Sequence, residues 1–226
     1  MANPEFVHAA RLMNGISVPL ERRILAWLAA RMPASIGPDH LTALGFVAMI
    51  GAGACYWLGG SHPLALLGVV VCLAVNWFGD SLDGTVARAR RQERPRYGFY
   101  VDHVLDMFGS FFLLGGLALS GFMTPIVALG LLATYVMLTT EVYLATYCLA
   151  TFRLSFFKLG PTELRIVLAA GTLVLFVNPG ASALGGRFLL FDVGAVVAMC
   201  GIVVALVTST VRHTIDLYRA ERLPRG

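Results

Sequence analysis

The sequence predicts an all-α integral membrane protein with six transmembrane helices, preceded by an N-terminal amphipathic helix in the membrane interface. Of its 226 residues, 58% are hydrophobic and 13% are charged, whereas a soluble domain carries about 25% charged residues. The length suits a single domain over residues 1–226, with an interfacial region at 1–38 and a six-span core at 39–226.

Six apolar segments predict the spanning helices. They cover residues 41–58, 64–78, 99–119, 124–145, 164–177 and 193–211. A spanning helix needs about 20 residues, so the second and fifth segments look short. The second continues directly into Asp80 and Asp83, and we therefore expect its helix to run past Asp83 before the chain turns back at 90–97.

The N-terminal segment and the basic residues predict the orientation. Residues 21–32 alternate apolar and charged side chains as an interfacial helix does, and Pro33 and Pro38 end it. If both termini lie on one side, that side holds every Lys and Arg except Arg187. The positive-inside rule then places both termini on the cytoplasmic side of a cell membrane of the bacterial inner-membrane type. The net charge of +4 reflects this topology and attraction to anionic lipids, and gives no reason to invoke nucleic acid.

Four aspartates in apolar sequence are the main functional signal. Asp80 and Asp83 are three residues apart, and Asp102 and Asp106 are four apart, so each pair shares a helix face. Ionised acids in a bilayer are costly and mark functional sites by default. Four carboxylates brought together need cations between them, and their hard oxygens suit magnesium, manganese or calcium.

Small residues and an arginine accompany the acids. Gly84, Ala87 and Gly98 leave room for a ligand beside the backbone, and Arg88 offers a guanidinium fork to phosphate oxygens. Metal, arginine and accessible backbone together indicate a diphosphate ligand at the cytoplasmic ends of the helices.

The order of these residues resembles the signature of the CDP-alcohol phosphotransferases. The pattern reads Asp80-x-x-Asp83-Gly84-x-x-Ala87-Arg88, nine residues, Gly98-x-x-x-Asp102-x-x-x-Asp106. Upstream, Pro38-Asp39-His40-Leu41-Thr42 resembles the family's P-N-x-x-T element, with Asp39 where Asn is usual. The resemblance implies an enzyme of phospholipid synthesis. Such an enzyme transfers a substituted phosphate from a CDP-linked donor to an alcohol, one of the two being a lipid, and releases CMP. It also implies a homodimer.

The resemblance also implies a role for each position of the signature. Asp80, Asp83 and Asp102 would hold two Mg²⁺ or Mn²⁺ ions, with Asp106 contributing. Asp106 would also act as the general base for the acceptor hydroxyl. The positions implied to surround the cytidine diphosphate are Asp80, Asp83, Gly84, Ala87, Arg88 and Gly98.

Two interpretations of the substrates stay open. His103, together with Glu163 in Gly160-Pro161-Thr162-Glu163, resembles the choline and ethanolamine phosphotransferases, which use a CDP-amino alcohol donor. Packing alone also explains the histidine, and a helix start explains the glutamate.

In the other interpretation CDP-diacylglycerol is the donor and a phosphorylated polar alcohol is the acceptor. Arg153, Lys158 and Arg165 would then bind the acceptor phosphate, although topology alone also explains them. A Ser-x-x-Lys-Ala-Arg-like run, typical of the inositol phosphate enzymes, is absent from the sequence, which argues against inositol phosphate. Glu141, a further intramembrane acid, either lines the acceptor cavity or pairs with hydroxyls of nearby Thr and Tyr residues.

Two other classes are compatible with intramembrane acids. Membrane prenyltransferases bind diphosphates through Asp-rich motifs, but those motifs usually lie on well-separated helices. A cation transporter places its acids at mid-span, whereas these acids lie at helix ends. Neither class accounts for Gly84, Ala87, Arg88 and Gly98.

Overall fold

The computed structural model describes residues 10–12, 18–149, 151–153, 161–183 and 186–221. Within this part of the chain there are seven helices and four short strands. The helices are α1 (Val18–Arg31), α2 (Pro38–Gly59), α3 (Ala65–Ala89), α4 (Pro95–Leu119), α5 (Pro125–Leu149), α6 (Pro161–Val177) and α7 (Leu190–Ala220). The strands are β1 (Ala10–Leu12), β2 (Thr151–Arg153), β3 (Ser182–Ala183) and β4 (Phe188–Leu189).

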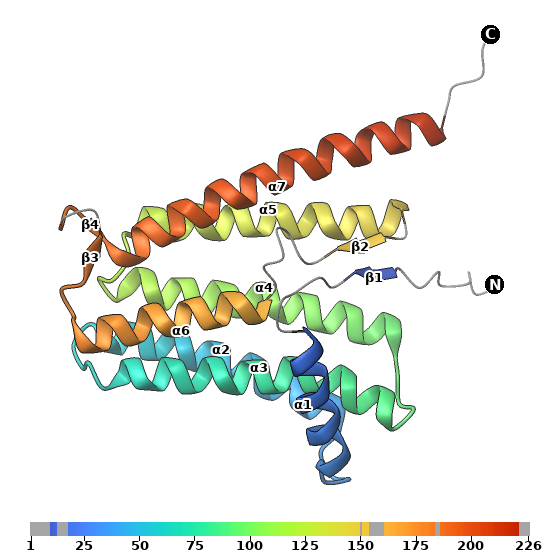
Figure 1. The fold of residues 1–226 in the computed structure, drawn as a ribbon, viewed down its shortest axis with the longest axis horizontal. Coiled ribbons are helices and arrows are strands. Elements are labelled where there is room, and N and C mark those ends of the chain that lie inside the picture. The colour runs from blue at the N-terminus through green and yellow to red at the C-terminus, as the bar shows by residue number, and fades with distance from the viewer. Residues whose placement is uncertain (1–9, 13–17, 150, 154–160, 184–185, 222–226) are drawn as a thin grey trace.

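Six helices form an elongated bundle, and α1 crosses one end of it (Figure 1). Helix α2 packs against both α3 and α4, α6 packs on α3, and α5 lies between α4 and α7. The connection from α3 to α4 and the C-terminal end of α7 lie at the end that carries α1, and β3 and β4 lie at the opposite end (Figure 1). The cytoplasmic side predicted from the basic residues is therefore a single end of the bundle.

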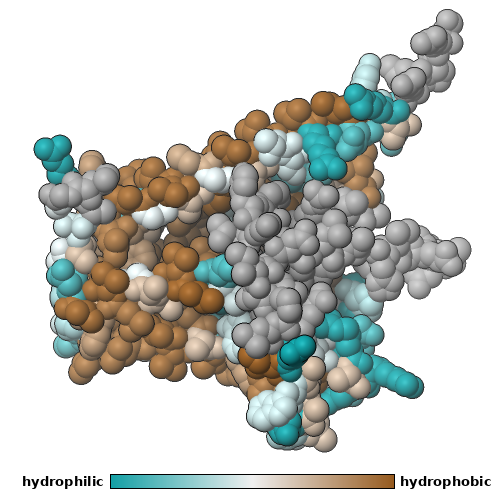
Figure 2. Space-filling view, viewed as in Figure 1, coloured by the Kyte–Doolittle hydropathy of each residue, from teal (hydrophilic) through white to brown (hydrophobic). Residues whose placement is uncertain are grey.

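Within the described residues, five helices are long and apolar enough to cross a membrane, namely α2, α3, α4, α5 and α7. Helix α6 has 17 residues, slightly fewer than a spanning helix usually needs. A broad hydrophobic band covers the middle of the visible face, between more hydrophilic ends (Figure 2). Many large apolar side chains of the long helices, such as Val71, Ile126 and Val197, are exposed, as expected of surfaces that face lipid.

Glycines let α2 approach α3 and α4 closely. A side chain at Gly116 of α4 would overlap the carbonyl of Gly53 in α2. A side chain at Gly79 of α3 would lie 2.8 Å from the backbone nitrogen of Gly45 in α2. These crossings bring backbones together as small residues do in membrane bundles. They also set α3 and α4 on the same side of α2, where both carry aspartates.

The N-terminal helix packs onto α3. Leu25 and Ala29 are buried against Leu82 and Val86 of α3, while Trp27 on the opposite face is 56% exposed. Helix α1 covers most of the predicted segment 21–32, but it begins earlier, at Val18, and ends at Arg31. Its place in a membrane interface stays a prediction.

The all-α prediction is confirmed, and short strand pairs accompany the helices. Strands β1 and β2 pair in parallel, and β3 and β4 pair antiparallel. Each pair is only two or three residues long, so the fold class remains all-helical.

Candidate functional site

Helices α3 and α4 bring three aspartates together at the end of the bundle that carries α1. Carboxylate oxygens of Asp80, Asp102 and Asp106 lie within 4.8 Å of one another, and all three side chains are half-buried. Asp102 and Asp106 point the same way because residues four apart on a helix differ by only about 40° in direction. The predicted convergence of the two aspartate pairs therefore holds for three of the four acids.

The space between these carboxylates is small. A cavity of about 10 Å³ lies there, which is about the volume of one water molecule or ion. Its lining comes from α2, α3 and α4: Thr42, Gly45, Phe46, Met49, Asn76, Asp80, Asp102, Leu105 and Asp106. Three converging carboxylates suit a hard divalent cation such as Mg²⁺ or Mn²⁺.

Asp83, the fourth acid, lies outside this trio. Thr42 of α2 donates a 2.6 Å hydrogen bond from its hydroxyl to Asp83 Oδ2. The backbone N–H of Gly84 donates to Asp83 Oδ1. Residues three apart on a helix differ by about 60° in direction, so Asp83 leans toward α2 while Asp80 faces α4.

Arg165 of α6 reaches the aspartate trio. Its guanidinium forms an ion pair with Asp80 and donates from Nε to Asn76 Oδ1 at 2.7 Å. Asn76 in turn donates to the carbonyl of Gly45 at 3.0 Å. Of the three basic residues predicted for the acceptor phosphate, Arg165 is the one whose contacts the structure describes, and these contacts place it at the site.

The positions predicted to surround the nucleotide lie along α3 and at the start of α4. Beside Gly84, a side chain would meet only Arg88 within 4 Å, and beside Gly98 it would meet nothing. Ala87 is half-buried. The exposed Arg88 donates to the hydroxyl of Thr85 at 3.3 Å. Among the described residues, the space next to the backbone is therefore open at Gly98, whereas at Gly84 it is occupied by the side chain of Arg88.

Two charged residues at the starts of α2 and α4 form an ion pair. Arg94, just before α4, forms an ion pair with Asp39 in the first turn of α2. The hydrogen bond from Arg94 to Asp39 raises the pKa of the guanidinium. Asp39 stands where the resembled P-N-x-x-T element carries Asn, so here the acid has a basic partner.

His103 is buried among aromatic side chains. Its Nδ1 lies 2.6 Å from the carbonyl of Phe99, and because a carbonyl only accepts, Nδ1 carries the proton. The ring stacks on Phe99 at 4.2 Å between centroids and meets the edge of Tyr143 at 5.1 Å. This environment favours a packing role for His103. The carboxylate of Asp102 lies 3.8 Å from Nδ1 of His103.

Glu141 of α5 faces α7. It lies 2.6 Å from Nδ1 of His213 and accepts a 2.9 Å hydrogen bond from Ser209. Thr139 and Thr140 donate to the carbonyl of Val136, so their hydroxyl protons are not directed at Glu141. The contacts of Glu141 favour a role in joining α5 to α7.

The remaining predicted acceptor residues are described only in part. The side chain of Arg153, in β2, and the whole of Lys158 lie outside the described residues. Glu163 is half-buried in the first turn of α6, a position that favours an acid through the helix dipole.

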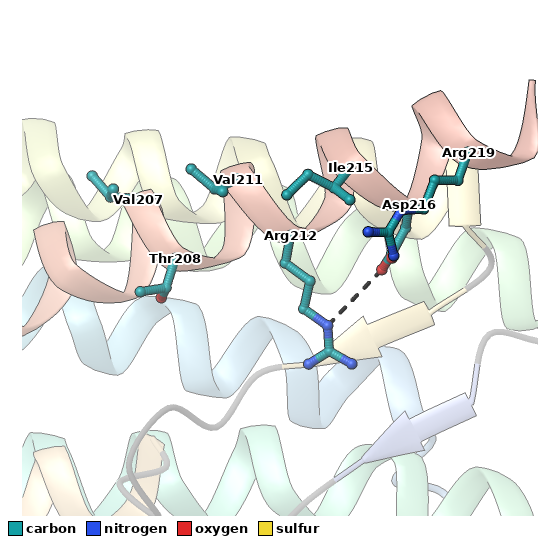
Figure 3. Close-up of a pocket in the computed structure, with 7 residues that line it drawn as sticks. All are labelled: Val207, Thr208, Val211, Arg212, Ile215, Asp216 and Arg219. Atoms are coloured by element: carbon teal, nitrogen blue, oxygen red, sulfur yellow. Dashed lines mark ion pairs between the residues drawn. The ribbon is translucent and has the colours of Figure 1, made fainter. Parts of the chain in front are cut away.

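A larger, open groove runs along α7 and is separate from the aspartates. Its volume is about 530 Å³. Arg212 projects from the helix and approaches Asp216 at 3.9 Å (Figure 3). The described residues that line this groove all belong to α7: Val207, Thr208, Val211, Arg212, Ile215, Asp216 and Arg219. None of the residues predicted from the sequence lies on this groove.

Three further polar residues at the site were not singled out as site residues from the sequence. Thr42 binds Asp83, and Asn76 binds Arg165. Tyr135 of α5 lies within electrostatic range of Asp106. Asn76 precedes Asp80 by one helical turn, and Thr42 belongs to the upstream motif, so a signal existed for both. Tyr135 carries no such sequence signal.

A comparison of the sequence with known families identifies the family of this chain. Residues 35–211 match the sequence pattern of CDP-alcohol phosphatidyltransferases. This match covers most of the chain, and the protein belongs to the CDP-alcohol phosphatidyltransferase family. A curated relative is the archaetidylinositol phosphate synthase of Methanothermobacter thermautotrophicus, which is 32% identical over 128 residues. The aligned segment spans 54% of this chain and 62% of the relative's length.

Proposed function

We propose that this protein transfers a substituted phosphate from a CDP-linked donor to an alcohol acceptor, with release of CMP, in phospholipid synthesis. The observation that carries the proposal is the convergence of Asp80, Asp102 and Asp106 within 4.8 Å. Family membership supplies the reaction class, and the trio lies where two helices bearing the family's signature meet.

The donor set supports a divalent metal site. Asp80, Asp102 and Asp106 would hold the metal, with Asp83 able to join by leaving Thr42. All four offer carboxylate oxygens, and the three acids of the trio outnumber the single guanidinium of Arg165 that pairs with Asp80. We infer two ions, Mg²⁺ or Mn²⁺. When bound, such ions clamp the diphosphate and offset the charge that develops on the leaving phosphate.

The protein's own residues then bind the substrates and move one proton. Gly84, Ala87 and Gly98 leave room for the cytidine diphosphate, and Arg88 forks onto its phosphate oxygens. Asp106 takes the proton of the acceptor hydroxyl. The acceptor oxygen forms a bond to the phosphorus that bears the donor's substituent. The bond from that phosphorus to the oxygen retained by CMP breaks, and CMP leaves.

We favour the arrangement in which the donor carries the lipid and the acceptor is a phosphorylated polar alcohol. Arg165 lies against Asp80 and keeps further N–H groups that could bind an acceptor phosphate. The name of the relative, archaetidylinositol phosphate synthase, also describes a lipid joined to a phosphorylated alcohol. The packing of His103 gives less support to the CDP-amino alcohol alternative. The missing Ser-x-x-Lys-Ala-Arg-like run leaves the identity of the acceptor open to experiment.

The apolar helices and the distribution of the basic residues support a membrane arrangement for this protein. We infer six spans, with α6 as the sixth, α1 in the interface, and both termini and the active site on the cytoplasmic side of a cell membrane. A water-soluble nucleotide would then reach the aspartates from the cytoplasm while lipid tails stay in the bilayer. We also infer a homodimer, as the family resemblance implies.

The test is CMP release by purified protein with Mg²⁺, using CDP-diacylglycerol, CDP-choline or CDP-ethanolamine with a panel of alcohols. Release from CDP-diacylglycerol with a phosphorylated alcohol, lost in Arg165→Gln, is the expected result. Release from a CDP-amino alcohol with diacylglycerol would reverse the assignment and direct attention to His103 and Glu163. Competition by prenyl diphosphates alone would indicate a prenyltransferase. Metal binding without any CMP release would favour a cation transporter.

A further inference from the structure

Arg90 lies just after α3 and binds the connection between α1 and α2. Its guanidinium donates to three backbone carbonyls, those of Ile36 at 2.7 Å, Met32 at 2.8 Å and Pro33 at 2.9 Å. Carbonyls beyond the end of a helix lack intrahelical partners, and a cation there is favoured by the helix dipole. The Arg90 side chain thus holds the end of α1 and the segment before α2 against the end of α3.

Three of the contacts between α3 and residues 32–45 follow one order along the chain, and the contact of Arg90 is the outermost of these. The innermost is the backbone crossing of Gly79 with Gly45. Asp83 with Thr42 comes next, and Arg90 with Ile36 is the last. Residues nearer the C-terminus of α3 contact residues nearer the N-terminus of α2, as expected for antiparallel helices.

Asp80 lies between the Gly79 crossing and the Asp83–Thr42 contact along α3. Asp83 is seven residues before Arg90, about 10 Å along a helix. Besides Arg90, the start of α2 is held to α3 near the site by the hydroxyl of Thr42 and by Leu41, which is buried with Leu82 and Val86 of α3. A shift there would move the carboxylate that Thr42 holds, and the neighbouring backbone of Gly84.

We propose that Arg90 is a positioning residue for the active site, which fixes the register of α2 against α3 and thereby the placement of Asp83. It acts through Thr42 and touches neither substrate nor metal. Its neighbour Arg91 is exposed and carries the same charge, so it offers a matched control. The inference that this register serves catalysis rests on the proposed function, whereas the contact itself does not.

The first measurement is hydrogen–deuterium exchange of the full-length protein in detergent or nanodiscs. Arg90→Gln should speed exchange about tenfold in peptides covering residues 32–45, because local opening becomes easier. Arg91→Gln should leave the same peptides unchanged. Equal exchange in the two variants would overturn the proposal, whatever the activity of the enzyme.

The second measurement is a double-mutant cycle with Thr42→Val, read as the Mg²⁺ concentration that gives half of the thermal stabilisation. Each single variant should raise this midpoint, and the double variant should raise it little beyond the larger single effect. Lysine at position 90 should restore the midpoint only in part, because it lacks the guanidinium fork. The positioning role is refuted if the two single effects on the midpoint multiply in the double variant. It is also refuted if Arg90→Gln and Arg91→Gln have equal midpoints.

The rate of CMP release separates this inference from the proposed function. Arg90→Gln should lower kcat/KM by about tenfold to a hundredfold, as small displacements of reacting groups do. If the wild-type protein binds Mg²⁺ and shows the exchange difference but releases no CMP from any donor, the proposed function fails and the contact stands. If CMP release is normal in wild type and in Arg90→Gln, the positioning role fails alone.

Discussion

Replacing Asp106 by asparagine should make the metal-free protein more stable and abolish its response to magnesium. Asp106 shares a half-buried site with Asp80 and Asp102, and the carboxylate oxygens lie within 4.8 Å of one another. Asparagine keeps the shape of the side chain but removes one negative charge. The metal-free protein therefore loses repulsion, while the site loses a ligand.

The magnitude follows from Coulomb's law. At 4.8 Å and an effective dielectric constant of about 20, two unit charges interact by about 3.5 kcal/mol. Two such partners at this separation give about 7 kcal/mol of repulsion, which Arg165 beside Asp80 and nearby water will reduce. A net gain of about 1–3 kcal/mol would raise Tm by about 2–12 °C for a chain of this size. Mg²⁺ at a hundred times its Kd stabilises the wild type by about 2.7 kcal/mol.

The assay is thermal unfolding in detergent, with EDTA and then with saturating Mg²⁺. The wild type should have the lower Tm in EDTA and the larger rise with Mg²⁺, and Asp106→Asn should show the reverse. Glu93→Gln, which removes an exposed acid in the turn between α3 and α4, should behave as wild type. A variant that is less stable in EDTA, or that responds to Mg²⁺ as wild type does, would refute the electrostatic account of the trio.

Three further predictions concern packing, the α5–α7 contact and the nucleotide. Gly116→Ala should lower the free energy of unfolding by about 1–3 kcal/mol, because its methyl group overlaps the backbone of α2. The control Gly115→Ala, with open space beside it among the described residues, should change the free energy of unfolding by less than about 0.5 kcal/mol. Equal melting curves of the two variants would contradict the close crossing of α2 and α4. Glu141→Gln should destabilise the protein by about 1.5–3 kcal/mol because it loses the contact with His213, while kcat/KM in the CMP assay should stay within about twofold of wild type. A selective loss of acceptor affinity would instead assign Glu141 to the acceptor site. Arg88→Ala should weaken CDP binding by about tenfold or more, measured by calorimetry, and unchanged affinity would remove Arg88 from the nucleotide site.

Hydropathy and charge predicted the helices well but not their ends. The expected second span at 64–78 continues to Ala89, and the expected last span at 193–211 extends from Leu190 to Ala220. Hydropathy marks the part of a helix inside the bilayer, whereas the helix itself continues into polar sequence for as long as its backbone is hydrogen-bonded. The extension of α3 past Asp83 was predicted because apolar sequence leads directly into the acids.

Helical spacing predicted the aspartate trio but not the placement of Asp83. The direction in which each acid points depends on how α2 packs against α3, and Thr42 is 41 residues away from Asp83 in sequence. The same limit applies to Arg165, which reaches Asp80 from 85 residues away, and to Glu141, whose partner His213 is 72 residues away. Residue type and local spacing indicate the chemistry, but contacts between distant helices decide which groups meet.

The central claim is that the aspartate trio supports transfer from a CDP-linked donor, and CMP release measures it most directly. Purified wild-type protein with CDP-diacylglycerol, a phosphorylated alcohol and Mg²⁺ should release CMP. EDTA should stop the release, and Asp106→Asn should bind the nucleotide without turnover. Near-normal turnover by Asp106→Asn, or CMP release that persists in EDTA, would contradict the account.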